Sequence, residues 1–280
     1  MEAAASTPRP GLVMLTNNVV QSNTATSGAA TGNGGGLYLS NITATLSSNV
    51  IATNTAGKGK EGCGGGVYAE GGILTVHDNT VEGNVASTAD RGVGGGLRFG
   101  GVTYTRTLVT LTGNRIRSNI GSAAATNTAG FRSGAGGLEL WLTSGTVNGN
   151  TITGNTGATA QAAYCGGVAI HTGSNAAVNF SGNTVAANVA GPDGSAGGGL
   201  CLNGATTASG NTIRANRATT TGAGRGGGVA LGLGPQGTAV GGPVTLDGNT
   251  IQSNTAGATG DGRGGGVYIS RQVAPPTASP

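Results

Sequence analysis

The sequence predicts an all-β fold, a single-stranded parallel β-helix (solenoid) of about eight coils with three short strands in each. Three observations predict it: a repeat of roughly 30 residues, an alternation of apolar and polar residues with a period of two, and 59 glycines among 280 residues. Only 9% of the residues are charged and 3% are aromatic. Charge repulsion therefore does not keep the chain unfolded, and a wide core of large side chains cannot form. A narrow, repetitive core satisfies both conditions.

The repeat unit consists of a glycine-rich triplet, two apolar residues at alternate positions, a short connection, two asparagines five residues apart and a polar loop. The first asparagines of the eight units are Asn18, Asn49, Asn79, Asn114, Asn150, Asn183, Asn211 and Asn249. The second asparagines are Asn23, Asn54, Asn84, Asn119, Asn155, Asn188, Asn216 and Asn254. A β-branched aliphatic residue follows two positions after every first asparagine, at Val20, Ile51, Val81, Ile116, Ile152, Val185, Ile213 and Ile251.

Each unit offers three short strands, one after the glycines, one before the first asparagine and one after it. Alternation along 108–112 (Leu-Val-Thr-Leu-Thr) and 266–269 (Gly-Val-Tyr-Ile) places one set of side chains inside and the other outside. Each strand is expected to pair with its copy one coil away, at about 4.8 Å. The predicted inner column consists of Leu37, Leu39, Val67, Ala69, Leu97, Phe99, Leu138, Leu140, Val168, Ile170, Leu200, Leu202, Val229, Leu231, Val267 and Ile269.

The asparagines and glycines are expected at the corners between strands. Asparagine tolerates the left-handed backbone conformation, and its amide can donate and accept, so stacked copies should hydrogen-bond along the rod. The glycine triplets mark a second corner, which needs positive φ or a close approach of two backbones. Neither set is predicted to bind phosphate or to take part in catalysis.

Two phrases carry a resemblance to a known superfamily: Gly-Gly-Gly-Val-Tyr at 264–268 and Asn-Thr-Ile-x-x-Asn-Thr-Ala at 249–256. They resemble the right-handed parallel β-helix repeat superfamily, which includes pectate-lyase-like enzymes and polymorphic outer-membrane-protein passengers. The resemblance covers residues 12 to about 270 and is closest to the adhesin-like passengers. It implies right-handed winding and either an adhesin-like role or polysaccharide processing.

The predicted organisation is an N-terminal tail at 1–10, the β-helix at 11–271 and a proline-rich tail at 272–280. Neither tail resembles a capping helix, so we expect a segment of a longer surface protein or end-to-end self-association. The first ten residues lack a signal-peptide profile, no apolar run approaches a membrane helix, and a net charge of +4 is too small for a nucleic-acid partner. The three cysteines are interpreted as small buried or half-buried residues, since their odd number excludes complete pairing.

The candidate ligand-binding residues come from the third to fifth coils. Glu139 corresponds in the repeat to Arg98, and Trp141 to His171, so all four should share one outer face. The full candidate set is Arg98, Arg115, Arg117, Arg132, Glu139, Trp141 and His171. A tryptophan beside arginines can bind a sugar or uronate through ring stacking and bidentate contacts. The alternative is a surface ion pair between Arg98 and Glu139 beside a partly buried tryptophan.

These observations predict a non-catalytic extracellular or cell-surface module, adhesin-like or a stalk, with a polysaccharide or cell-surface glycan as partner. No catalytic residue, metal or cofactor is predicted, because the ten acidic residues form no paired or triple carboxylate motif. A polysaccharide lyase or glycoside hydrolase is the alternative. Ice binding is a further alternative, suggested by an outward column at Thr45, Thr75, Thr110, Thr146, Thr207 and Thr245.

Long connections on a repeat scaffold are the expected positions for binding. Three connections exceed the usual length, at 97–113, 120–134 and 229–248.

Overall fold

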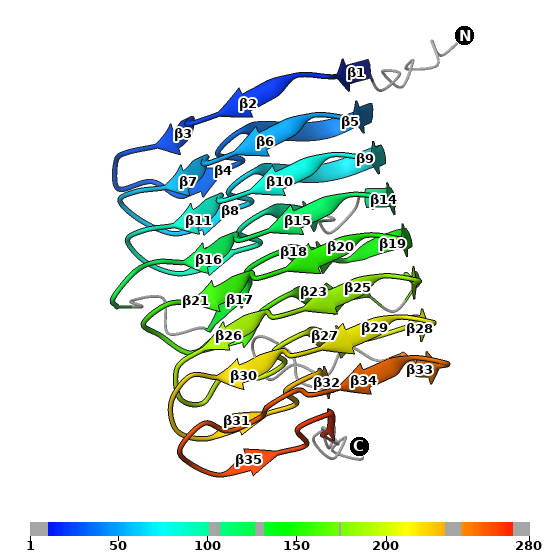
Figure 1. Ribbon diagram of the computed structural model, residues 1–280. Helices are drawn as coiled ribbons and strands as arrows, with labels where there is room; N and C mark the ends of the chain where they lie inside the picture. Colours follow the sequence, from blue (N-terminus) through cyan, green and yellow to red (C-terminus); the bar gives the residue numbers. More distant parts are fainter. Residues whose placement is uncertain (1–10, 101–106, 127–131, 174, 233–241, 271–280) are drawn as a thin grey trace, which may run out of the picture.

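The chain forms a parallel β-helix in the computed structural model (Figure 1). The structure describes residues 11–100, 107–126, 132–173, 175–232 and 242–270. These residues contain 36 strands and no helix, and each strand pairs in parallel with a counterpart in a neighbouring coil. The predicted all-β fold is confirmed. Both predicted tails and parts of the three long connections lie outside the described residues.

Three stacks of strands form the faces of the rod, which we call A, B and C. Faces A and B join into one 14-stranded sheet because β5 (Leu37–Ser47) and β9 (Val67–His77) run through both. Gly72, with φ of 87°, lies inside β9 where the two faces meet. The eight strands of face C mark the levels of the rod, which completes about seven turns.

Face A consists of the strands after the glycine triplets and contains, besides β5 and β9, β13 (Leu97–Gly100), β18 (Leu138–Trp141), β23 (Val168–His171), β27 (Leu200–Asn203), β32 (Val229–Leu231) and β36 (Val267–Ile269). Face B adds β1 (Leu12–Thr16), β14 (Thr107–Thr112), β19 (Thr143–Asn148), β24 (Val178–Ser181), β28 (Thr206–Ser209) and β33 (Val244–Asp247). Face C consists of β2 (Val19–Gln21), β6 (Val50–Ala52), β10 (Thr80–Glu82), β15 (Arg115–Arg117), β20 (Thr151–Thr153), β25 (Thr184–Ala186), β29 (Thr212–Arg214) and β34 (Thr250–Gln252).

The segment from the second asparagine to the next glycines forms short strands, whereas the sequence predicts a polar loop there. A seven-stranded sheet contains β3 (Thr24–Thr26), β7 (Thr55–Gly57), β11 (Val85–Ser87), β16 (Ile120–Ser122), β21 (Thr156–Ala158), β26 (Val189–Gly191) and β30 (Arg217–Thr219). Three smaller sheets contain β4 (Gly32–Asn33), β8 (Gly62–Cys63) and β12 (Gly92–Val93), then β17 (Ser133–Ala135) and β22 (Ala163–Cys165), then β31 (Gly224–Arg225) and β35 (Gly262–Arg263). Because each coil repeats the path of the one before, even two extended residues find a partner.

One narrow hydrophobic core runs along the inside of the rod. Leu46, Ile51 and Phe99 are fully buried there, and most of the predicted inner column belongs to this core. Ile269 is predicted to be inside but is 73% exposed, because it lies in the last described coil. Burial of one such side chain contributes roughly 1.5–3 kcal/mol, and the contribution recurs in every coil.

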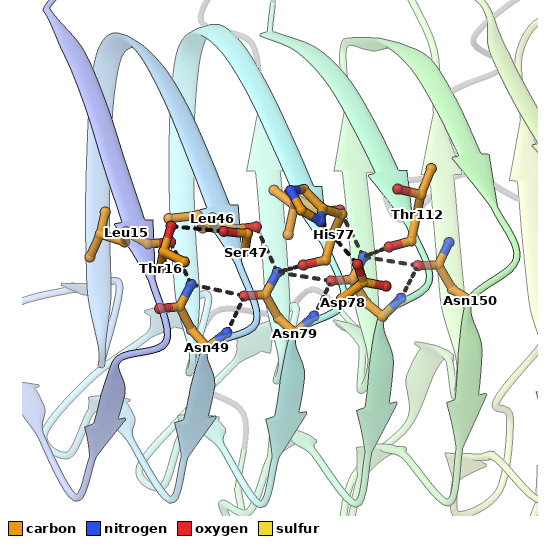
Figure 2. Close-up of polar contacts among 12 residues, drawn as sticks. Leu15, Thr16, Leu46, Ser47, Asn49, His77, Asp78, Asn79, Thr112 and Asn150 are labelled. Carbon is orange, nitrogen blue, oxygen red and sulfur yellow. Dashed lines mark hydrogen bonds and ion pairs between the residues drawn. The ribbon is translucent and has the colours of Figure 1, made fainter.

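Two asparagine ladders run along the corners on either side of face C, as predicted. The backbone N–H and the side-chain Nδ2 of Asn79 both donate to Oδ1 of Asn114, at 2.9 and 3.0 Å. Nδ2 of Asn79 also donates to the Leu46 carbonyl at 2.8 Å. Figure 2 shows the same pattern from Asn49 to Asn150. Each step therefore satisfies buried polar atoms that would otherwise destabilise the corner.

The left-handed backbone lies one residue before each ladder asparagine, not at the asparagine itself as the sequence analysis predicts. Gly113 and Gly149 occupy this position in two coils, with φ of 66° and 64°. Ser48 and Ala187 adopt φ of 54° in others. The asparagine is fixed by its two bonds to the next coil, so the preceding residue makes the turn.

The glycine triplets meet both predicted needs at different positions. Gly64, the first of its triplet, has φ of 61°. Gly65, the second, lies so close to the next coil that a Cβ there would stand 2.3 Å from the Gly95 carbonyl oxygen. Only glycine allows the coils to stack at this corner.

Candidate binding surface on face A

Four of the predicted site residues lie side by side on the outer side of face A. Arg98 of β13 is in register with Glu139 of β18, and Trp141 of β18 is in register with His171 of β23. None of the four belongs to the inner core. The alignment of coils predicted from the sequence is therefore confirmed for these residues.

Glu139 and His171 are nevertheless buried, with 2% and 1% of their surfaces exposed, so the predicted open face is wrong for both. A second apolar cluster, here called the outer cluster, packs on this side of face A. It consists of Ala135, Tyr164, Cys165, Ala169, Ala196, Cys201 and Ala230. Alternation separates the two sides of a strand, but it does not show that β17 and β22 cover the outer side.

The outer cluster contains a disulfide between Cys165 and Cys201, whose Cα atoms lie 6.0 Å apart. Both cysteines are buried and Cys63 is free and half-buried, which agrees with the predicted burial and incomplete pairing, but this disulfide was not predicted. Cys201 points outward from β27, in register with Ala169 of β23. The disulfide therefore fastens β22 over the outer side of face A.

Separate polar contacts hold the two charged groups of this face. The backbone N–H of Ala135 donates to Glu139 Oε2 at 3.0 Å. Arg98 Nη1 donates to Cys63 Sγ at 2.9 Å. In the part of the chain that the structure describes, no ion pair joins Arg98 to Glu139, so the predicted alternative of a surface ion pair is wrong.

His171 lies between two aromatic rings, with its ring centroid 4.9 Å from that of Tyr164 and 5.2 Å from that of Trp141. Neither ring nitrogen of His171 has a hydrogen-bond partner among the described residues. Burial, reinforced by the positive charges of Arg98 and Arg91, lowers the pKa of His171 to about 3. The imidazole is therefore neutral at physiological pH.

The remaining predicted residues do not join this group. Arg115 and Arg117 lie on β15 of face C and are exposed. Nε of Arg117 donates to Glu82 Oε2 at 2.6 Å, which makes an exposed ion pair. Arg132 directly precedes β17 and lines a hollow near the other end of the rod. These arginines come from the same part of the rod as Arg98 and Glu139, but they face other sides of it.

An aromatic column that was not predicted lies beside Arg98. Tyr38 of β5 and Tyr68 of β9 are in register, with ring centroids 5.6 Å apart. Tyr68 is in turn in register with Arg98, whose guanidinium lies 5.5 Å from the centroid of the Tyr68 ring. The signal was the repeat position itself, because all three residues stand two places after the last glycine of their triplets.

Glu70 orients the two tyrosines. Both phenol hydroxyls donate to its carboxylate, that of Tyr68 at 2.9 Å. Burial, together with the Glu70 carboxylate, raises the pKa of Tyr68. In strand register Glu70 aligns with Gly100 and then with Trp141, so Gly100 separates the carboxylate from the indole. We call Tyr38, Tyr68, Glu70 and Arg98 the tyrosine column.

The chain matches no protein-family model, no curated protein and no solved structure. Functional inference therefore depends on the fold and on the residues that it brings together.

The threonine column on face B is confirmed in register, but Asn179 interrupts it between the coils of Thr146 and Thr207. Within the described ranges, no three His, Cys, Asp or Glu side chains lie close enough together to hold a metal ion. The same ranges contain no helix of the length and hydropathy needed to span a membrane.

Proposed function

We propose that this protein is a non-catalytic, adhesin-like β-helix module of the cell surface or extracellular space that binds a glycan at the tyrosine column. The observation that supports it is the pair of adjacent tyrosine rings beside an arginine on the outer side of face A. The carboxylates of Glu70, Glu82 and Glu139 accept hydrogen bonds from a tyrosine, an arginine and a backbone N–H, respectively. These structural contacts favour a scaffold over a catalytic centre.

The geometry suits a sugar ring. Tyr38 is 49% exposed, and the C–H side of a pyranose can stack on an aromatic ring of this kind. Glu70 holds the phenol hydroxyls, so little rotamer freedom is lost when a ligand binds. Each aromatic contact contributes roughly 0.5–1.5 kcal/mol, which predicts weak binding that gains strength when several copies act together.

The disulfide supports the proposed location. Disulfides persist in oxidising compartments and are rare in the cytosol. Cys165 and Cys201 form the one disulfide among the described residues, and it joins two successive coils. This pairing is what an extracellular protein with a narrow core uses to fix a covering segment.

A glycan array followed by calorimetry on the best ligand tests the proposal. We expect Tyr38→Ala to weaken binding by about 2- to 10-fold, because one stacking contact is lost. Ile73→Ala is the matched control, since Ile73 is a comparably exposed apolar residue on face B. Absence of any glycan ligand, or equal affinities of Tyr38→Ala and wild type, would contradict the proposal.

The enzymatic alternative has its own test. Incubation of the protein with polyuronates, followed by assays for unsaturated products and new reducing ends, should show no turnover. Turnover that Glu139→Ala abolishes would replace a binding module by a polysaccharide-processing enzyme. Ice shaping by the intact protein would instead favour the threonine column of face B.

A further inference from the structure

A hollow of about 130 Å³ lies toward the C-terminal end of the rod, where β31 and β35 stack. Figure 1 shows both strands at the lower end of the molecule. The polar and charged side chains that line it are Arg132, Ser195, Arg225, Asp261 and Arg263. We call this site the arginine hollow.

Strand register explains why the hollow exists. Arg225 of β31 pairs with Arg263 of β35, so these two side chains stand one coil apart on the same side. Arg132 and Asp261 hold the position just before the short strand in two distant coils. Between them, the same position carries only small residues, Ala162, Gly194 and Ala223. The small residues leave the space into which the arginines extend.

The hollow has more positive than negative charge. Asp261 is its single lining carboxylate, against three guanidinium groups. Within the described part of the chain, no ion pair engages Arg132, Arg225 or Arg263. Burial and the positive charge of Arg225 lower the pKa of Arg132. Like charges placed together without a partner are costly, and an anion between them relieves the repulsion.

Two neighbouring contacts prepare the site. Ser195 is buried and its Oγ accepts a hydrogen bond from the Ala163 N–H at 3.0 Å, which leaves the hydroxyl hydrogen able to donate to a ligand. The Arg225 guanidinium lies 5.9 Å from the centroid of the Tyr268 ring, which limits its orientations.

We propose that the arginine hollow binds one oxyanion group, a sulfate, phosphate or carboxylate, held by the three guanidinium groups and the Ser195 hydroxyl. The planar guanidinium fork matches two oxygens of such a group. A volume of about 130 Å³ accommodates one oxyanion with an ordered water or two. The proposal does not depend on glycan binding at the tyrosine column, since the two sites share no residue.

Calorimetric titration with sodium sulfate and with sodium phosphate, at ionic strength held constant with sodium chloride, tests the proposal. We expect saturable binding of one anion per chain. Arg225→Gln and Arg263→Gln should each weaken it by at least about tenfold, because a charge-assisted hydrogen bond is lost. Asp261→Asn should strengthen it, because a repelling carboxylate is removed.

Arg214→Gln is the matched control, since Arg214 is an exposed arginine on β29 of face C, outside the hollow. It should bind sulfate as the wild type does. Arg225 and Arg263 are exposed, so their variants are expected to fold, and circular dichroism checks this. If Arg225→Gln does not fold, Arg225→Lys keeps the charge and loses the fork, and should still weaken binding. The proposal fails if no saturable heat appears, or if Arg214→Gln weakens binding as much as Arg225→Gln.

A further titration distinguishes the source of the anion. Glucose 6-sulfate and galacturonic acid present the same oxygens on a sugar. If either binds more tightly than the inorganic anions and loses affinity in Arg263→Gln, the hollow recognises an acidic saccharide. If inorganic sulfate or phosphate binds more tightly, with the same loss, it recognises a free anion.

Discussion

The asparagine corners and the outer side of face A both bury polar groups, but they differ in how completely these groups are hydrogen-bonded. At the corners, every coil repeats one arrangement, in which each amide donates to the next asparagine and to a backbone carbonyl. On the outer side of face A, the coils differ, and the buried Tyr164 hydroxyl and both His171 nitrogens have no hydrogen-bond partner among the described residues. The repeated columns therefore carry stability, and the departures from the repeat are where properties specific to this protein arise.

The largest expected effect comes from breaking a ladder in its middle. In Asn119→Ala, the buried amides of neighbouring coils and the Val81 carbonyl lose their partners. Each unsatisfied buried group costs about 1–3 kcal/mol, so we expect a loss of about 3–5 kcal/mol in the free energy of unfolding. Urea denaturation followed by circular dichroism measures it.

Asn23→Ala is the matched control, because Asn23 is the first asparagine of the same ladder and lies at the exposed end of the rod. It should cost less than about 1 kcal/mol, since water replaces the lost bonds. Equal losses in the two variants would show that the ladder does not act through burial, and the contrast between the two regions would disappear.

The same contrast explains how much the sequence could predict. Eight copies of the asparagine and aliphatic columns predicted the corners, the inner core and the pairing of Arg98 with Glu139. The repeat could not predict the burial of Glu139, because β17 covers it and Ser133–Ala135 departs from the glycine pattern of other coils. The sequence also could not show that Arg132 and Arg225 line one hollow, because that arrangement depends on the small residues in the intervening coils.

The pH dependence of stability tests the poorly satisfied region. The pKa of His171 is about 3 in the folded protein, against an ordinary value of 6.5. Between these values the unfolded chain binds more protons than the folded one, so stability is complete above about pH 6.5 and falls as the pH is lowered toward 3. The slope should reach up to about 1.4 kcal/mol per pH unit.

Thermal or urea unfolding at several pH values, with His171→Phe beside the wild type, isolates this contribution. Phenylalanine keeps a ring between Tyr164 and Trp141 but cannot titrate, so the variant should lose much less stability below pH 6. His77→Gln, which changes the only other histidine, a half-buried residue on face B, should follow the wild type. The buried-histidine explanation is wrong if His171→Phe and wild type have the same pH profile.

The smallest effect concerns the regular region, where the repeat itself is imperfect. Ala187 has φ of 54° in the position that Gly83 and Gly154 occupy in other coils. A left-handed non-glycine residue costs about 1–2 kcal/mol, and glycine adds about 0.5–1 kcal/mol of backbone entropy to the unfolded state. Ala187→Gly should therefore raise the free energy of unfolding by about 0.5–1 kcal/mol. Ala123→Gly, an exposed position without positive φ, should lower it instead, and a loss in both variants would show that the corner imposes no strain on alanine.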